Sequence, residues 1–322
     1  MNNSVLVTGA NGFVGRHLLM QALDEGFTVF AGVRKKSHVD TIKDLDVNIV
    51  RIDYSSVEHI RQSLAEYGPF DYVVHNAGVT EAIDLAAYRE GNVEVSKRLA
   101  IALQEGQLLR SNFVYVSSLA ARGPEYKGFD APISDYGKSK KEAEEQVINT
   151  GIDLVIVRPT AVYGSGDKAF LPLVKLLKNH IALSIGYKSQ KLTFIHGADL
   201  ARFIMILRDK KGEIFYAHDG KVYLQDHLTK AIKMALNRRN VIPVHIPAGL
   251  IKFVSLGINS IYNSIFKKSW HYNPSKIREL LAKDWTIDQG EKQLQQVNFK
   301  PKFSLAEGFK ESVEFYRTNK WL

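Results

Sequence analysis

Short apolar runs alternate with helical patterns through the first half of the chain. Residues 4–8, 27–33, 48–55, 70–78, 112–118 and 153–164 each hold a compact run of apolar and β-branched side chains, which predicts strands. Between these runs, apolar residues recur at helical spacing, as at Leu18, Leu19, Ala22 and Leu23. Strands alternating with helices predict an α/β fold, a doubly wound parallel sheet covered by helices on both faces.

Three glycines, Gly9, Gly12 and Gly15, lie between the first predicted strand and the first predicted helix. Such a turn directs backbone N–H groups and the positive end of a helix at one point, where a phosphate binds. Gly9 permits the tight turn, Gly12 lets the backbone approach a pyrophosphate, and Gly15 lets the helix pack on the strand. The pattern predicts a dinucleotide-binding Rossmann fold; a turn without a ligand is the alternative.

The end of the second predicted strand bears on the choice of cofactor. NAD-specific sites usually carry an acidic residue there for the ribose hydroxyls, whereas this chain has Val33. Arg34 and Lys35 follow, and their charge would pair with the 2′-phosphate of NADP. This favours NADP, with NAD as the second choice; cations that simply face water are the alternative interpretation.

The second half of the chain has a different texture. Helical runs dominate beyond Gly166, broken by strand-like pieces at residues 191–196 and 213–220. We expect residues 1–165 to form the dinucleotide-binding domain, joined by segments near 193–218, and residues 166–322 to form mainly a smaller, mixed substrate-binding domain.

An apolar face recurs at helical spacing between residues 250 and 265 of this second half. We favour core or a pocket wall over a membrane-surface helix, because the opposite face is not especially cationic. The face comprises Leu250, Phe253, Val254, Gly257, Ile258, Ile261 and Ile265.

Composition narrows the class of protein. The 322 residues include no cysteine, which excludes disulfides, thiol nucleophiles and thiolate metal sites. The ten histidines form no H-E-x-x-H motif, so we expect no metal. Since we find neither a membrane span nor a signal peptide, we expect a cytoplasmic protein. The net charge of +9 is spread along the chain without a basic stripe, so we expect no nucleic-acid partner.

A tyrosine and a lysine four residues apart, Tyr136 and Lys140, follow the fifth predicted strand. On a helix that begins at or just after Tyr136, this spacing puts both side chains on one face. An ammonium beside a phenol lowers the pKa of the phenol, which makes it a usable acid or base near neutral pH. The pair therefore indicates proton transfer near the predicted nucleotide site.

These motifs together resemble the extended short-chain dehydrogenase/reductase family, also called the NAD-dependent epimerase/dehydratase family, over nearly the whole chain. The matching segments are T-G-A-N-G-F-V-G at residues 8–15, the acid at Asp53, H-N-A-G at residues 75–78, Asn92-Val93, Tyr136-x-x-x-Lys140, R-P-x-x-V-Y-G at residues 158–164 and the closing G-F-K-E-S-V-E-F-Y-R-T-N-K-W-L.

The resemblance implies hydride exchange between a nicotinamide and a substrate carbon, with three catalytic residues. Tyr136 would transfer the proton, Lys140 would hold the nicotinamide ribose, and Ser118, counted from Gly123, would orient the substrate oxygen. The implied cofactor-binding residues are Gly9, Asn11, Gly12, Phe13, Val14, Gly15, Arg34, Lys35, Asp53, Tyr54, Asn76, Ala77, Gly78, Asn92, Tyr136, Lys140, Pro159, Thr160 and Val162.

Departures from the family pattern narrow the reaction. Leu119 and Ala120 stand where dehydratases usually carry an Asp-Glu pair, which argues against dehydration. Arg122 stands where sugar epimerases often have tyrosine, and we expect it to contact an anionic substrate or to lie at the surface. Asp199 is expected to be a structural cap rather than a catalyst.

The sequence therefore predicts an NADP-dependent oxidoreductase that acts on a small molecule, a secondary alcohol or ketone. A nucleotide-sugar epimerase or 4-ketoreductase is the alternative enzyme, and a non-catalytic NADP-binding sensor is the alternative outside catalysis. The resemblance further implies a homodimer through helices near Asn92 and Tyr136.

Overall fold

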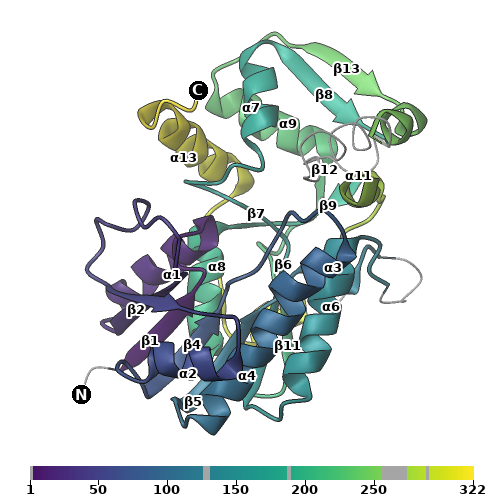
Figure 1. The fold of residues 1–322 in the computed structure, drawn as a ribbon. Helices are drawn as coiled ribbons and strands as arrows, with labels where there is room; N and C mark the ends of the chain where they lie inside the picture. Colours follow the sequence, from purple (N-terminus) through teal and green to yellow (C-terminus); the bar gives the residue numbers. More distant parts are fainter. Residues whose placement is uncertain (1–2, 126–130, 187–189, 256–273, 288–289) are drawn as a thin grey trace.

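The alternating apolar runs form a single seven-stranded parallel sheet in the structure, a computed structural model that describes residues 3–125, 131–186, 190–255, 274–287 and 290–322 (Figure 1). The strand order is β11-β6-β5-β4-β1-β2-β3, and every neighbouring pair is parallel. The predicted doubly wound α/β fold is thus confirmed. The strands are β1 Ser4–Thr8, β2 Thr28–Arg34, β3 Asn48–Ile52, β4 Phe70–His75, β5 Leu109–Val116, β6 Leu154–Pro159 and β11 Ile214–Ala217.

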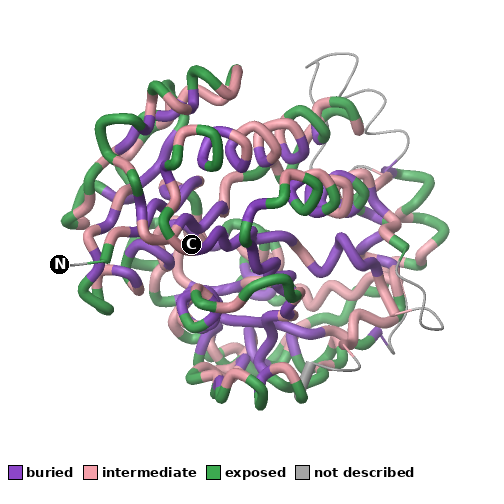
Figure 2. The backbone as a smooth tube through the Cα atoms, turned by 90° about the horizontal axis from the view of Figure 1, so that it is seen from below, coloured by how far each residue is buried: buried purple, intermediate pink, exposed green. Residues whose placement is uncertain are grey.

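Helices cover both faces of this sheet because its strands are apolar on both sides. Val5 and Val7 of β1 pack with α1 and α8 on one face, and Leu6 packs with α2, α4 and α6 on the other. Figure 2 shows the buried backbone through the middle of the molecule. The helical elements of this lobe are α1 Phe13–Asp24, α2 Val57–Leu64, α3 Leu85–Tyr88, the π-helical η1 Arg89–Glu94, α4 Val95–Glu105, α5 Leu119–Arg122, α6 Asp135–Ile148, α8 Gly197–Ile206 and the 3-10 turn η2 Leu207–Asp209.

The apolar run at residues 153–164 forms two strands rather than one. Both the backbone N–H and the Oγ1 of Thr160 donate to the carbonyl oxygen of Ala217, at 3.0 and 3.1 Å, at the point where β6 ends. The next strand, β7 Ala161–Tyr163, pairs instead with β10 Phe194–His196. The chain therefore leaves the main sheet at Thr160.

A second lobe lies above the sheet in the view of Figure 1. Its core contains Tyr163, Val174, Ile232, Phe309 and Tyr316. Its elements are α7 Leu171–Lys178, β8 Ile181–Ile185, β9 Lys191–Leu192, β12 Tyr223–Leu224, α9 Gln225–Ala235, β13 Ile242–Ile246, a helical segment at residues 248–255, α11 Pro274–Leu281 and α13 Leu305–Thr318. The remaining helix, α12 Gly290–Gln296, contacts β11 of the sheet.

The apolar face predicted at residues 250–265 is not core where the structure describes it. Leu250, Phe253 and Val254 are 55%, 78% and 40% exposed, so the expectation of core is wrong for these three, while the alternative of a pocket wall stays a prediction. The other members of that face, Gly257, Ile258, Ile261 and Ile265, lie outside the described residues. Among the helices that the structure describes, none has the length and apolarity needed to cross a bilayer.

Candidate functional site

The glycine loop connects β1 to α1 and requires glycine at two positions. Gly9 has φ +64°, and a methyl group added to it would lie 2.8 Å from the Cα of Ala77. A methyl group on Gly15 would lie only 2.2 Å from the carbonyl oxygen of Gly9, so α1 packs directly on the loop. Gly12 is the N-cap of α1 and brings no side-chain cap, which leaves the first-turn N–H groups for an anion. The loop therefore fits the pyrophosphate of a dinucleotide.

The end of β4 lies against this loop. The backbone N–H of Ala77 donates to Thr8 Oγ1 at 3.1 Å, and Asn76 Nδ2 reaches the carbonyl oxygen of Gly9 at 3.5 Å. A methyl group on Gly78 would lie 3.1 Å from Asn92 Oδ1 and 3.9 Å from Lys140 Nζ. The structure therefore brings the loop, the β4 motif and Lys140 to one edge of the sheet.

Asn92 lies in the π-helical turn η1 and is almost fully buried. Its Oδ1 accepts a hydrogen bond from the Val79 N–H at 2.7 Å, and its Nδ2 donates to Ser139 Oγ at 2.9 Å. Ser139 Oγ donates in turn to the carbonyl oxygen of Tyr136 at 2.8 Å. Asn92 thus joins the loop after β4 to the first turn of α6, and π-helical turns are frequent at functional sites.

The end of β2 carries the residues expected to meet the adenosine ribose. Arg34 and Lys35 are exposed, and Lys35 Nζ forms an ion pair with Asp53 at 2.7 Å. Hydrogen bonds from Lys35 and Ser55 hold the pKa of Asp53 well below its ordinary value. Of the two cations, Lys35 is therefore paired with Asp53, whereas Arg34 faces solvent and makes no ion pair with Asp53. Tyr54, next in the chain, packs against the core, and burial raises its pKa above the usual 10.

The remaining predicted cofactor contacts lie around these strand ends. Asn11 Nδ2 donates to the carbonyl oxygen of His38 at 2.9 Å, which ties the glycine loop to the segment after β2. Val14 packs against the core, and the Phe13 ring meets His17 edge-on at 5.3 Å. Pro159 ends β6, Thr160 turns the chain, and Val162 lies in β7 opposite Ile195.

Ser118, Tyr136 and Lys140 come together from two neighbouring elements. Ser118 is the N-cap of α5, directly after β5, and its hydroxyl lies near enough to the Tyr136 phenol to lower the pKa of that phenol. Tyr136 and Lys140 lie one turn apart on α6. Lys140 Nζ is buried and donates to the carbonyl oxygen of Val116 at 2.8 Å. A phenol, a hydroxyl and an ammonium thus meet at the carboxyl end of β5.

The pKa of Tyr136 differs from the sequence-based expectation. Burial raises it to about 12, the nearby Ser118 hydroxyl lowers it only in part, and Glu279 and Tyr88 raise it further. The predicted lowering by Lys140 is therefore wrong for this structure. Lys140 itself loses solvation, which lowers its pKa to about 8, while Glu144 raises it. At neutral pH the phenol is neutral and the lysine carries its proton.

A buried acid that the sequence analysis did not single out lies on the same face of α6. Glu144, one turn after Lys140, forms an ion pair with Arg158 at 2.7 Å, and both side chains are less than 10% exposed. Ser117 Oγ donates to the Glu144 carboxylate, and Arg158 also donates to the Tyr216 hydroxyl at 2.9 Å. Ser117 is thereby engaged in a structural network. The sequence indicates this position of Glu144, because residues at i, i+4 and i+8, here Tyr136, Lys140 and Glu144, lie on one face of a helix.

Arg122 is neither at the surface nor free to meet a ligand with its whole side chain. It is 7% exposed, and one terminal nitrogen donates to the carbonyl oxygen of Thr286 at 2.7 Å. The surface interpretation of Arg122 is therefore wrong. Its guanidinium also lies 5.7 Å from the centre of the Tyr216 ring and 3.7 Å from Glu125. The residue connects α5 to the chain after α11.

The second lobe also holds the start of α6. Ser134 caps the helix by accepting from the Gly137 N–H at 2.9 Å, and its hydroxyl donates to the carboxylate of Glu279 in α11. The Asp135 N–H donates to Ser275 Oγ at 2.7 Å, and Arg278 donates to the carbonyl oxygen of Ile133 at 2.8 Å. Three residues of α11 thus fix the turn that carries Tyr136.

Asp199 has a structural role, as expected, although not as the cap of its own helix. Its carboxylate accepts hydrogen bonds from the backbone N–H groups of Lys302 and Phe303, at 2.9 to 3.0 Å, and pairs with Arg202 at 2.7 Å. His196 is the N-cap residue of α8 instead. Asp199 therefore holds the segment that leads into α13.

Comparison with known proteins finds relatives that match nearly the whole chain. A ceramide reductase from Caulobacter vibrioides is 27% identical over 99% of this chain and 96% of its own length. A UDP-glucose 4-epimerase from Vibrio cholerae is 26% identical over 98% of this chain and 96% of its own length. The solved structure of Thermus thermophilus UDP-glucose 4-epimerase with NAD shares the fold, with a TM-score of 0.75 and 18% identity over 98% of this chain and 99% of that chain.

The family itself follows from a longer match. Residues 5–217, about two thirds of the chain, match the NAD dependent epimerase/dehydratase family, which confirms the resemblance seen in the motifs. The relatives named as reductases, epimerases and dehydrogenases support a nicotinamide-dependent enzyme. With its glycine loop, its Ser118–Tyr136–Lys140 cluster and this match in agreement, the chain belongs to the NAD dependent epimerase/dehydratase family.

Proposed function

We propose that the protein is an NADP-dependent reductase that converts a ketone to a secondary alcohol with Ser118, Tyr136 and Lys140. The observation that carries the proposal is a buried, neutral phenol beside the Ser118 hydroxyl, at the same sheet edge as the glycine loop. A phenol with a pKa of about 12 holds its proton at neutral pH and can give it to a developing alkoxide. The full-length likeness to a ceramide reductase supports the reductive direction.

Each residue has a distinct task in the proposed reaction. The nicotinamide supplies the hydride when it is bound. Ser118 and Tyr136 donate hydrogen bonds to the substrate oxygen and stabilise the charge that develops there. Tyr136 then transfers its proton to that oxygen. Lys140 places a positive charge beside the ribose, and Val116 fixes its ammonium at 2.8 Å.

The second candidate is a nucleotide-sugar epimerase, because a UDP-glucose 4-epimerase matches the chain over nearly its whole length. That reaction would use the same three residues with a hydride removed and returned. Arg122, buried against Thr286, replaces the tyrosine common in such enzymes, which favours the reductase. A non-catalytic sensor is the weakest alternative, since the Tyr136 and Lys140 pair is complete and assembled.

A panel of ketones and nucleotide sugars tests the reaction. The expected result is consumption of NADPH with ketones, without inversion of nucleotide sugars, and tighter binding of NADPH than of NADH. Tyr136→Phe should lower kcat by roughly a hundredfold or more, with a much smaller effect on NADPH affinity. Tyr67→Phe, at a partly exposed tyrosine on the same lobe, is the matched control. Tyr136→Phe with wild-type turnover would contradict the proposal, and tighter NADH binding would contradict the cofactor assignment.

A further inference from the structure

The outer end of the second lobe carries positive charge without any acid in two long segments. Residues 171–186, which form α7 and β8, and residues 233–255, which run from the end of α9 through β13, contain no aspartate or glutamate. The same segments hold six cationic residues: Lys175, Lys178, Lys233, Arg238, Arg239 and Lys252. A net charge of +9 spread over the chain therefore has one local concentration here.

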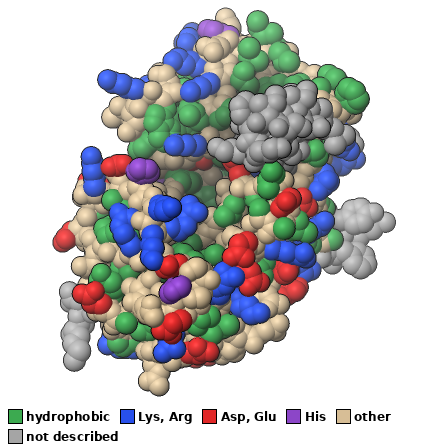
Figure 3. All heavy atoms as spheres, in the orientation of Figure 1, with side chains coloured by type: hydrophobic (Ala, Val, Ile, Leu, Met, Phe, Trp, Pro, Cys, Tyr) green, Lys and Arg blue, Asp and Glu red, His purple; other side chains and the backbone are tan. Residues whose placement is uncertain are grey.

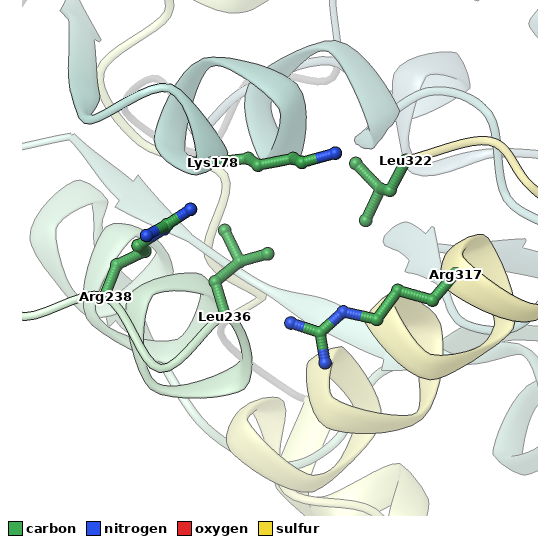
Figure 4. A pocket seen from close by; sticks show the side chains of 5 residues that line it. All are labelled: Lys178, Leu236, Arg238, Arg317 and Leu322. Atoms are coloured by element: carbon green, nitrogen blue, oxygen red, sulfur yellow. The ribbon is translucent and has the colours of Figure 1, made fainter.

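Three cations converge at this end from the last turns of three helices. Lys178 ends α7, Arg238 follows α9, and Arg317 lies in the last turn of α13; together with Leu236 and Leu322 they line one small pocket (Figure 4). Among the described residues, we find no ion pair for any of the three. Cations near helix C-termini are stabilised by the helix dipoles, which explains how the lobe tolerates them so close together.

Exposed apolar side chains lie on β13, which follows Arg238 and Arg239 in the chain, and on the helical segment after it. Ile242 and Phe253 are 66% and 78% exposed, with Val244 and Leu250 also exposed. The Ile242 N–H donates to the carbonyl oxygen of His180 at 2.7 Å. Because His180 follows Lys178 by two positions in the chain, the start of β13 lies near Lys178. Figure 3 shows hydrophobic side chains at the upper right of the second lobe and basic ones at its upper left. Several exposed large apolar side chains on neighbouring elements are unusual on a soluble monomer and indicate a surface that makes an interaction.

We propose that this outer surface, defined by Ile242, Val244, Leu250 and Phe253 with Lys178, Arg238 and Arg239, docks the protein on an anionic lipid bilayer. Apolar side chains enter the boundary between headgroups and acyl chains, and the neighbouring cations pair with the negative headgroups. The absence of acid from residues 171–186 and 233–255 removes the repulsion that such a surface would otherwise meet. This inference is independent of the proposed reaction, because none of these residues belongs to the Ser118–Tyr136–Lys140 cluster.

Vesicle flotation with the full chain tests the docking surface. We expect binding to phosphatidylcholine vesicles that contain about 30% phosphatidylglycerol, and much weaker binding to phosphatidylcholine alone, since each cation near an anionic surface strengthens the attraction. Lys178→Gln, Arg238→Gln and Arg239→Gln should each weaken binding about fivefold. Phe253→Glu should abolish it, because the variant puts a charge where an apolar side chain enters the bilayer.

Matched controls separate docking from general charge and from folding. Lys43→Gln and Met20→Glu, at exposed positions of the larger lobe, should leave vesicle binding unchanged. Phe253 is largely exposed, so Phe253→Glu should keep its melting temperature and its NADPH affinity. No binding to anionic vesicles, or equal binding to neutral ones, would overturn the proposal. So would a stable dimer in sedimentation that Phe253→Glu dissociates, because the face would then be covered by a second copy.

Discussion

Burial shifts the pKa values of the two titratable groups proposed to act in catalysis, Tyr136 and Lys140, in opposite directions. It raises the pKa of Tyr136 to about 12 and lowers the pKa of Lys140 to about 8, because a low-dielectric site disfavours the charged form of each. The phenol is therefore ready to donate a proton, and the lysine is close to losing its own. The neutral Tyr136 phenol favours the reductive direction, and the lowered pKa of Lys140 should limit activity at alkaline pH.

The pH profile should show that limit. We expect kcat/KM to fall as the pH rises through about 8, when Lys140 becomes neutral, rather than near the ordinary lysine pKa of 10.5. Initial rates with NADPH between pH 6 and about 10 measure the profile. A rate that stays level past this range, with cofactor bound throughout, would contradict the assigned role of Lys140.

The contribution of Lys140 to stability should move the opposite way over the same range, so unfolding can be separated from lost activity by measurement. The pKa of Lys140 is lower in the folded state than its ordinary value, so the unfolded chain binds more protons between about 8 and 10.5. The contribution of Lys140 to the free energy of unfolding therefore increases with pH in this window. Urea unfolding at several pH values, compared with Lys140→Met, isolates this contribution.

The buried pair of Glu144 and Arg158 is the most sensitive point for stability near the site. Glu144→Ala leaves the Arg158 guanidinium buried and short of its carboxylate, so we expect a loss of about 3–5 kcal/mol in the free energy of unfolding. Glu142 lies on the same helix and pairs with Arg89 at the same 2.7 Å, but half exposed. Glu142→Ala should therefore cost less than about 1 kcal/mol. Equal losses in the two variants, measured in urea, would count against the role of burial.

Sequence reasoning predicted that Tyr136 and Lys140 share a helix face, which the structure confirms, but it did not predict what surrounds them. Tyr136 and Lys140 were predicted to share a face because they are four residues apart in a stretch with a helical pattern. Their pKa values, the bond from Lys140 to Val116 and the burial of Arg122 depend on partners brought close only by folding. Patterns within one element reveal which residues share a face, and burial across elements decides how those residues titrate.

Single elements followed the hydrophobic pattern closely, with two informative differences. The six apolar runs of the first half all became strands, because β-branched residues in short runs pack between two helical layers. The run at residues 153–164 divided at Thr160, where hydrogen bonds to Ala217 redirect the chain. The helical segment at residues 248–255 has an apolar face with no core to meet, and periodicity alone does not show which surface covers such a face.

The contact between α1 and the glycine loop should not tolerate even one extra carbon. In Gly15→Ala the added methyl would meet the carbonyl oxygens of Gly9 and Ala10 at 2.2 and 2.7 Å, so α1 has to move away from β1. We expect a loss of about 1–3 kcal/mol in the free energy of unfolding and a marked loss of NADPH affinity. The control is Gly249→Ala, in a helical segment where the added methyl meets nothing within 4 Å, and it should lower neither quantity. An affinity equal to wild type in Gly15→Ala would contradict the proposed phosphate contact.

At the scale of the whole molecule, local patterns predicted the layers but not the complete strand order. β11 joins the sheet beside β6 after more than fifty residues of intervening chain, much of it in the second lobe. Residues 213–220 are strand-like in the sequence, but that pattern does not say which strand they pair with; the place of β11 is set by pairing with Ile156 and its neighbours. The packing of the two lobes at α6 likewise depends on contacts such as that of Glu279 with Ser134. These two residues are far apart in the chain, so no local sequence pattern predicts their contact.

Self-association is the prediction that belongs to this scale. We expect a homodimer through α4 and α6, the helices near Asn92 and Tyr136, as the family resemblance implies. Sedimentation equilibrium should then give twice the chain mass of 36.2 kDa. This dimer should persist in Phe253→Glu, since that side chain lies in the second lobe. A chain that sediments at its monomer mass across the concentration range would contradict the prediction.

The hydrogen bonds between α11 and the start of α6 limit which segments of this enzyme can be exchanged with those of its relatives. Ser275, Arg278 and Glu279 come from a stretch that a designer of hybrid proteins would assign to specificity alone. Replacing α11 with that of a relative would also remove the hydrogen bonds that fix the helical turn of Tyr136. We therefore expect such hybrids to show altered substrate choice together with reduced turnover. Successful hybrids should retain these three side chains or import the matching first turn of α6 along with the new lobe.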